Sequence, residues 1–72
     1  MTTYEKAKAT LPADHIDHHG SDLYLKDCDQ TRAIIAAHEF ADNVTRFRSQ
    51  IDGTIWYDVP FAFDPWWTAR IK

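Results

Sequence analysis

The dipeptide Asp52-Gly53 lies between two segments of alternating character, and this arrangement constrains the fold more than any other feature of the chain. Asp-Gly is a strong signal for the turn of a β-hairpin, because glycine adopts the left-handed backbone that such turns require. We therefore expect a hairpin over residues 44–59. Because successive side chains of a strand point to opposite faces, the length of the loop decides which residues face the interior.

The sorting of polar and apolar residues predicts the register of this hairpin. A two-residue loop would place Phe47 opposite Asp58 and would mix both kinds of residue on each face. A three-residue loop pairs Gln50 with Thr54 and separates the two kinds, with Phe47 and Tyr57 on the face that a helix covers. The sorted pattern favours the three-residue loop.

This register has two consequences for the opposite face of the hairpin. Arg46 lies across from Asp58, where the two form an ion pair, and Arg48 lies across from Trp56, within reach of a cation–π contact. We therefore expect both arginines to bind within the chain.

Residues 2–11 are expected to form a short helix. Thr2 and Glu5 have the spacing of a capping box, in which each side chain binds the free backbone amide of the other residue. Pro12 ends the helix. Its apolar stripe comprises Tyr4, Ala7 and Leu11.

A second helix is expected over residues 28–41, with Asp27 or Asp29 as its cap. His38 lies on its apolar side and is expected to be a packed histidine with one hydrogen bond. Residues 23–26 alternate leucine with polar residues and predict a short strand.

The predicted fold is therefore a small α+β domain that spans residues 1–72 in the order α-β-α-β-β. A three-stranded sheet packs on helix 28–41, with strand 23–26 beside strand 54–59. A loop rich in His and Asp occupies residues 13–22, and an aromatic tail occupies residues 60–72. The predicted core comprises Leu23, Leu25, Ile34, Ile35, Ala37, Phe40, Val44, Phe47, Ile55, Tyr57 and Val59, joined by Tyr4 and Leu11.

Composition limits the class of protein. The 72 residues carry a net charge of −3 and one cysteine, Cys28, which excludes an internal disulfide and predicts a cytoplasmic protein. No apolar run is long enough to span a membrane. The acidic balance argues against direct binding of nucleic acid and permits a basic protein partner.

An aromatic strip, WYDVPFAFDPWW, covers residues 56–67. The core uses only part of it, and two adjacent tryptophans cannot both point inward from an extended segment. Phe61 and Phe63 are expected to fold back onto the second sheet face or the first helix. Exposed tryptophan, tyrosine and arginine side chains together are typical of interaction hot spots. The predicted partner-binding residues are Trp56, Asp58, Asp64, Trp66 and Trp67.

Catalytic and metal chemistry have weaker signals. His15, His18 and His19 would share one side of a helix and could bind a metal with Asp14, Asp17 or Asp22, but Gly20 and the Asp-rich context favour a loop. Cys28 has no positioned base and is expected to be an inert thiol. The chain has no phosphate-binding loop or nucleophile motif, so we expect neither an enzyme nor a cofactor.

The segment HHGSDLYLK, followed by a helix and then by IDGTIWYDVPFAFDPWW, resembles small open reading frames of tailed bacteriophages and prophages, over residues 15–67. The resemblance implies a phage accessory protein in the bacterial cytoplasm, of the anti-CRISPR or anti-defence type. Such a protein inhibits a host complex by stoichiometric binding. An alternative is an assembly protein that forms a homodimer, a larger homo-oligomer or a virion contact through the same strip. A third is a metal-binding protein.

Overall fold

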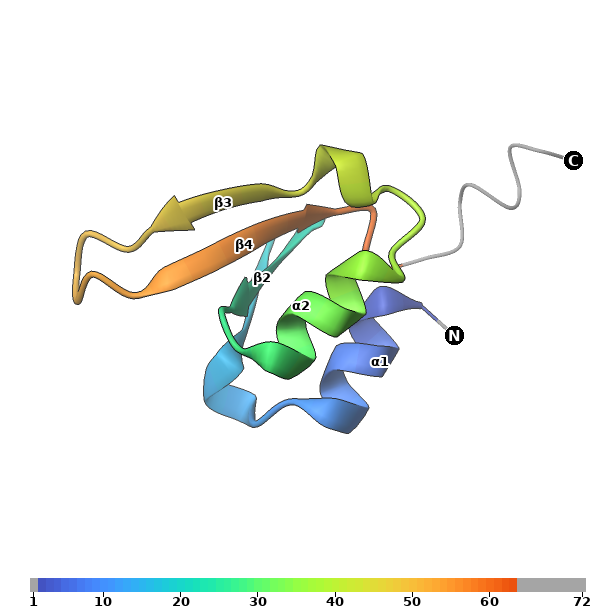
Figure 1. Ribbon diagram of the computed structural model, residues 1–72, viewed down its shortest axis with the longest axis horizontal. Helices are drawn as coiled ribbons and strands as arrows, with labels where there is room; N and C mark the ends of the chain where they lie inside the picture. The colour runs from blue at the N-terminus through green and yellow to red at the C-terminus, as the bar shows by residue number, and fades with distance from the viewer. Residues whose placement is uncertain (1, 64–72) are drawn as a thin grey trace, which may run out of the picture.

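The computed structural model describes residues 2–63 and shows two helices packed against one side of an antiparallel sheet (Figure 1). The helices are α1 (Thr3–Thr10) and α2 (Asp29–Ala36), with the short 3₁₀ helices η1 (Ala13–His15) and η2 (Ala41–Asn43). The strands are β1 (Ile16–His19), β2 (Asp22–Lys26), β3 (Thr45–Arg48) and β4 (Ile55–Pro60), in the spatial order β1-β2-β4-β3. The α+β class is confirmed, and the sheet has four strands where three were predicted.

Helix α1 begins as its sequence predicts. The Glu5 amide donates to the Thr2 hydroxyl at 3.1 Å, and the Thr2 amide donates to the Glu5 carboxylate at 2.8 Å. These two bonds complete the capping box. The helix ends where the Leu11 amide donates to the Ala7 carbonyl, and both of these residues are buried.

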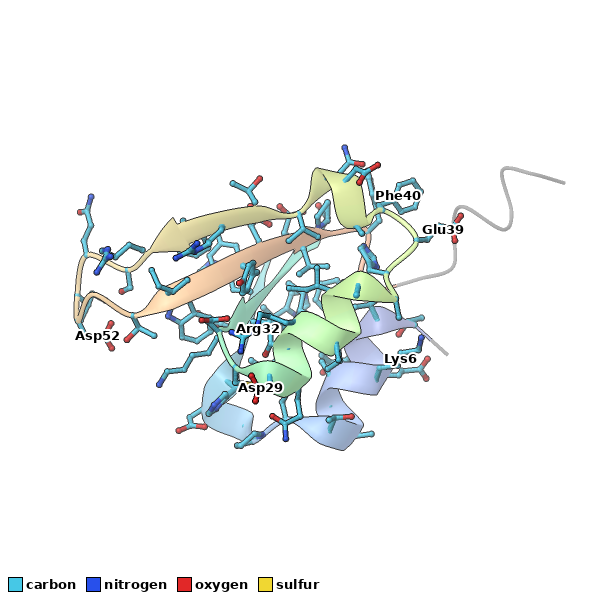
Figure 2. The ribbon with its side chains drawn as sticks, in the orientation of Figure 1. Lys6, Asp29, Arg32, Glu39, Phe40 and Asp52 are labelled. Carbon is cyan, nitrogen blue, oxygen red and sulfur yellow. The ribbon has the colours of Figure 1, made fainter. Side chains whose placement is uncertain are left out.

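Helix α2 is shorter than predicted and has a different cap. The Cys28 sulfur accepts a hydrogen bond from the Thr31 amide at 3.4 Å. Asp27 and Asp29, the predicted caps, both form ion pairs with Arg32, as Figure 2 shows for Asp29. The helix ends at Ala36 instead of residue 41, because His38 leaves the helical path to bind other elements of the fold.

The predicted loop 13–22 contains strand β1, and the loop prediction is wrong at this point. β1 pairs with β2 through the two-residue turn Gly20-Ser21, and Gly20 has a φ of 60°. A positive φ at the first turn residue is the pattern of a type II′ hairpin turn, for which glycine is preferred. Ile16 is the only strongly apolar residue of β1, so the alternation that predicts a strand is absent from this segment.

The β3–β4 hairpin has the predicted position and a different register. Thr45 pairs with Asp58 and Phe47 pairs with Trp56, one residue away from the predicted alignment. The loop has four residues, 50–53, closed by a hydrogen bond from the Ser49 amide to the Thr54 carbonyl at 2.8 Å.

Hydrogen bonds inside the loop explain its length. The Gly53 amide donates to the Ser49 carbonyl at 2.9 Å, the Ile51 amide to the Ser49 hydroxyl at 3.2 Å and the Thr54 amide to the Asp52 carboxylate at 3.0 Å. The loop therefore satisfies its own backbone, and the three-residue loop is wrong. The shifted register places Arg46 opposite Tyr57 and Arg48 opposite Ile55, so the predicted pairs of these arginines with Asp58 and Trp56 do not form.

The core lies between the sheet and the helices. Its buried residues are Ala7, Leu11, Leu23, Leu25, Ile34, Val59 and Ala62, and Tyr4, Ile16, Ile35, Val44, Tyr57 and Phe63 pack against them. Phe47, predicted to be in the core, lies on the opposite face of the sheet because of the register shift.

The last described residues return to α1. The chain turns at Phe61, which has a φ of 59°, and the Ala62 carbonyl accepts a hydrogen bond from the Tyr4 amide at 2.8 Å. Phe63 stacks on His18 with ring centroids 4.0 Å apart and contacts Tyr4 at 4.9 Å. Within residues 2–63, neither helix has the length and apolar composition needed to cross a membrane.

Candidate functional site

One face of the sheet is free of helices over the described residues, and we call it the outer face. Leu23, Leu25 and Val59 point to the helices, so the residues that alternate with them point the other way. The outer face carries Asp17, His19, Asp22, Tyr24, Lys26, Thr45, Phe47, Trp56, Asp58 and Pro60. It combines three aromatic side chains and the imidazole of His19 with three carboxyl groups.

Three rings of the outer face form a connected row, with a fourth beside them. His19 stacks on Tyr24 with centroids 4.1 Å apart, and Tyr24 meets Phe47 edge to face at 4.9 Å. Trp56 lies directly opposite Phe47 on the neighbouring strand. The row therefore crosses the whole sheet, from β1 to β3, and each ring is positioned by a strand.

A shallow hollow of about 330 Å³ lies on this face beside the hairpin loop. Tyr24, Phe47 and Trp56 provide its rings, and Asp17 and Asp52 provide its carboxylates. Asp52 belongs to the loop at the far end of the hairpin from the helices (Figure 2). Hydrogen bonds from Thr54 lower the pKa of Asp52, so its side chain is an anion at neutral pH.

The outer face also holds a pair of carboxyl groups, those of Asp22 and Asp58. Burial raises the pKa of Asp58 to about 6, and hydrogen bonding with Asp22 and its negative charge add to this shift. The Asp58 Oδ1 atom is buried and has no donor among the described residues. A proton on one of the two carboxyl groups provides a donor within the pair, and burial is the main reason why the protonated form of Asp58 is favoured.

The carboxyl pair and the hollow are separate features. Neither Asp22 nor Asp58 lines the hollow. The pair therefore lies beside the candidate binding site on the open sheet.

The predicted partner-binding residues divide into two groups. Trp56 and Asp58 lie on the outer face, as the alternation of β4 predicts. Asp64, Trp66 and Trp67 lie outside the described residues. Sequence reasoning did not assign Asp17, His19, Tyr24 or Phe47 to the same surface, because only strand pairing brings these residues beside Trp56.

The three histidines of the predicted metal cluster do not converge. They would share one side only on a helix, and β1 places His18 on the helix side of the sheet and His19 on the outer face. His18 binds the Gly20 carbonyl at 2.8 Å, His19 binds Asp17 at 2.7 Å, and His15 binds Asp14 at 2.8 Å. Within residues 2–63, no group of three or more His, Cys, Asp or Glu side chains is placed to hold a metal ion.

A second hollow, of about 350 Å³, lies between α1 and α2. Its lining is mainly small or aliphatic, with Ala9, Ala33, Ile34 and Ala37 among its residues, and it holds no aromatic ring and no carboxylate. The outer face therefore has the more specific chemistry.

Comparison of the chain with protein-family models, curated proteins and solved structures found no match. The function is therefore inferred from the geometry of this chain.

Proposed function

We propose that the chain is a non-enzymatic protein-binding module that inhibits a host defence complex by stoichiometric binding through its outer face. The observation that carries this proposal is the group of Tyr24, Phe47 and Trp56 on a sheet face that no described helix covers. Aromatic side chains are the residues that contribute most to protein interfaces. A phage-encoded inhibitor of the anti-CRISPR kind is the function class that the resemblance implies.

The charge of the outer face defines the partner. Asp17, Asp22 and Asp58 lie on its strands, and Lys26 is the one lysine or arginine that the register of the described strands places there. The chain as a whole carries a net charge of −3. An acidic surface attracts a basic one, and proteins that hold nucleic acid expose basic surfaces. The proposed partner surface is therefore the nucleic-acid channel of a host complex.

The test begins with capture of the partner from bacterial lysate, identified by mass spectrometry. The outer-face variant carries Phe47→Ser and Trp56→Ser. The matched control carries Arg46→Ser and Arg48→Ser, because these exposed arginines alternate with Phe47 on the same strand and lie on the other side of the sheet. Circular dichroism should show the wild-type spectrum for both variants, which tests that they are folded.

We expect the wild type and the arginine variant to capture a nucleic-acid-binding complex, and the outer-face variant to lose it. The purified chain should then block nucleic-acid binding by that complex. In a titration, inhibition should be complete at one chain per nucleic-acid-binding site of the complex. Capture that is unaffected by the outer-face variant contradicts the assignment of the surface. Nucleic-acid binding that persists at a molar excess of the chain contradicts the inhibitor function.

Light scattering tests the assembly alternative, in which the outer face joins copies of the chain. A wild-type dimer or larger oligomer that becomes monomeric in the outer-face variant would replace the inhibitor proposal with a role in assembly. A monomeric wild type supports the inhibitor proposal.

A further inference from the structure

We propose that the hollow of the outer face binds one arginine side chain of the partner. This inference rests on the proposed function and specifies the chemistry of the contact. The hollow, of about 330 Å³, combines aromatic side chains with carboxylates from two different elements, β1 and the hairpin loop. A planar cation is the ligand that uses both features.

The rings supply the surface on which the cation lies. Tyr24, Phe47 and Trp56 line the hollow, and the aromatic ring face attracts a cation within about 6 Å of its centre. Tyr24 is held between the stacked ring of His19 and the edge contact with Phe47. These contacts fix the aromatic wall before a ligand arrives, which reduces the entropy lost on binding.

Two carboxylates supply the hydrogen-bond acceptors. Asp52 is ionised at neutral pH, and hydrogen bonds from Thr54 lower its pKa further. Asp17 uses its Oδ2 atom to bind His19 at 2.7 Å, and its Oδ1 atom is not part of that contact. The guanidinium group of arginine carries five N–H donors in a plane, whereas the ammonium of lysine is compact. Two separate acceptors therefore fit arginine better than lysine.

The described cations of the chain are placed elsewhere. Arg32 binds Asp27 and Asp29, and Arg48 donates to the Gly53 carbonyl at 3.3 Å from the other side of the sheet. Lys26 lies on the outer face and its charge helps to lower the pKa of Asp52, but it does not line the hollow. Within residues 2–63 these cations lie elsewhere, and we therefore assign the cation to a partner.

The test uses a short peptide, N-acetyl-Gly-Arg-Gly-amide, and follows the Trp56 indole N–H by NMR. The variant Trp56→Phe assigns the resonance. The matched probe replaces arginine with citrulline, which has nearly the same shape and no charge. We expect saturable shifts with a dissociation constant on the order of millimolar for the arginine peptide, because one exposed side chain makes few contacts. The citrulline peptide should give no saturable shift.

Variants of the carboxylates locate the site. Asp17→Asn and Asp52→Asn should each weaken arginine binding about threefold or more, and the double variant should abolish it. Asp42→Asn is the control, since Asp42 is exposed on η2 and lies away from the hollow. Lys26→Ala should tighten binding, because it removes a positive charge from the same face.

Three results would overturn the proposal. The first is an equal shift with the citrulline peptide, and the second is arginine binding that is unchanged in the double variant. The third is a Trp56 resonance that moves in Arg70→Gln without any peptide, which would assign the hollow to an arginine of the chain itself. Peptide binding that depends on both carboxylates supports the arginine site even where no host complex is captured. If the outer-face variant loses the partner but the wild type does not bind the peptide, the proposed function is supported and the arginine site is contradicted.

Discussion

Phe47 and Trp56 lie directly opposite each other on β3 and β4, on the face of the sheet that the described helices leave uncovered. The pair depends on the four-residue loop, because a loop shorter by one residue turns Phe47 toward the helices. Two hydrogen bonds hold this loop, one from the Ser49 amide to the Thr54 carbonyl and one from the Thr54 amide to the Asp52 carboxylate. The composition of the outer face therefore depends on hydrogen bonds at the tip of the hairpin.

Cross-linking tests this register. In a Cys28→Ser background, cysteines at Arg48 and Ile55 should form a disulfide on mild oxidation, because these residues are direct partners at a position without ladder hydrogen bonds. Cysteines at Arg48 and Trp56, the pair expected for a three-residue loop, should cross-link much more slowly. Mass spectrometry of the oxidised variants measures both. Faster cross-linking of the second pair would show that the observed register is wrong.

The Asp22 and Asp58 pair predicts a specific dependence of stability on pH. The pKa of Asp58 is raised from its usual 3.8 to about 6, so the folded state binds this proton more tightly than the unfolded state. The resulting stabilisation is fully present below 3.8 and is lost as the pH rises through about 6. At neutral pH the ionised pair therefore destabilises the fold.

Asp58→Asn should remove this cost. We expect the variant to be more stable than the wild type at pH 7.5 by about 1 kcal/mol, after allowance for solvent screening, and the difference should shrink as the pH falls toward 4. Urea unfolding at several pH values measures it. Asp42→Asn is the control and should show no such trend. A difference between Asp58→Asn and wild type that is independent of pH would contradict the raised pKa.

His38 joins three elements of the fold. Its Nε2 atom donates to the Pro60 carbonyl at 2.8 Å at the end of β4, and its Nδ1 atom lies 2.6 Å from the Thr3 hydroxyl at the start of α1. The side chain is buried, with 7% of its surface exposed. It makes two hydrogen bonds, where one was predicted.

His38→Ala should therefore lower the free energy of unfolding by about 2–3 kcal/mol, because it leaves the part-buried Pro60 carbonyl without a donor and creates a cavity. Thermal or urea denaturation measures the loss. Glu39→Ala, at the exposed neighbouring position, should change stability by less than about 0.5 kcal/mol. Equal effects of the two substitutions would show that the His38 contacts do not stabilise the fold.

Cys28 is the cap of α2 and offers a conservative test of that role. A serine hydroxyl accepts a backbone hydrogen bond better than a thiol does, so Cys28→Ser should raise the free energy of unfolding by about 0.5 kcal/mol. Cys28→Ala removes the acceptor and should lower it by about 1 kcal/mol. Urea unfolding of both variants measures the order of stability. An alanine variant as stable as the serine variant would contradict the cap.

Local signals predicted those parts of the fold that depend on neighbours in sequence. Thr2 and Glu5 begin α1 because both partners of the capping box lie within one turn. The alternation of β4 correctly placed Tyr57 and Val59 toward the helices and Trp56 and Asp58 away from them. The position of strand β2 beside β4 was also predicted correctly.

Contacts between distant segments decided the rest. Residues 16–19 become a strand because they pair with β2, and this pairing separates His18 from His19. The end of α2 depends on the bonds of His38 to Thr3 and Pro60, which are far from it in sequence. In each case the local pattern allowed more than one conformation, and the hydrogen bonds made across the fold selected one.

The candidate site shows the same division. Trp56 and Asp58 could be assigned to one side of β4 from the sequence, because alternation is a property of the strand alone. Tyr24, Phe47 and Asp17 could not be added to them in this way, because cross-strand neighbours depend on strand order and register, which contacts across the fold establish. One residue more in the hairpin loop than the pattern suggested was enough to move Phe47 from the core to the outer face.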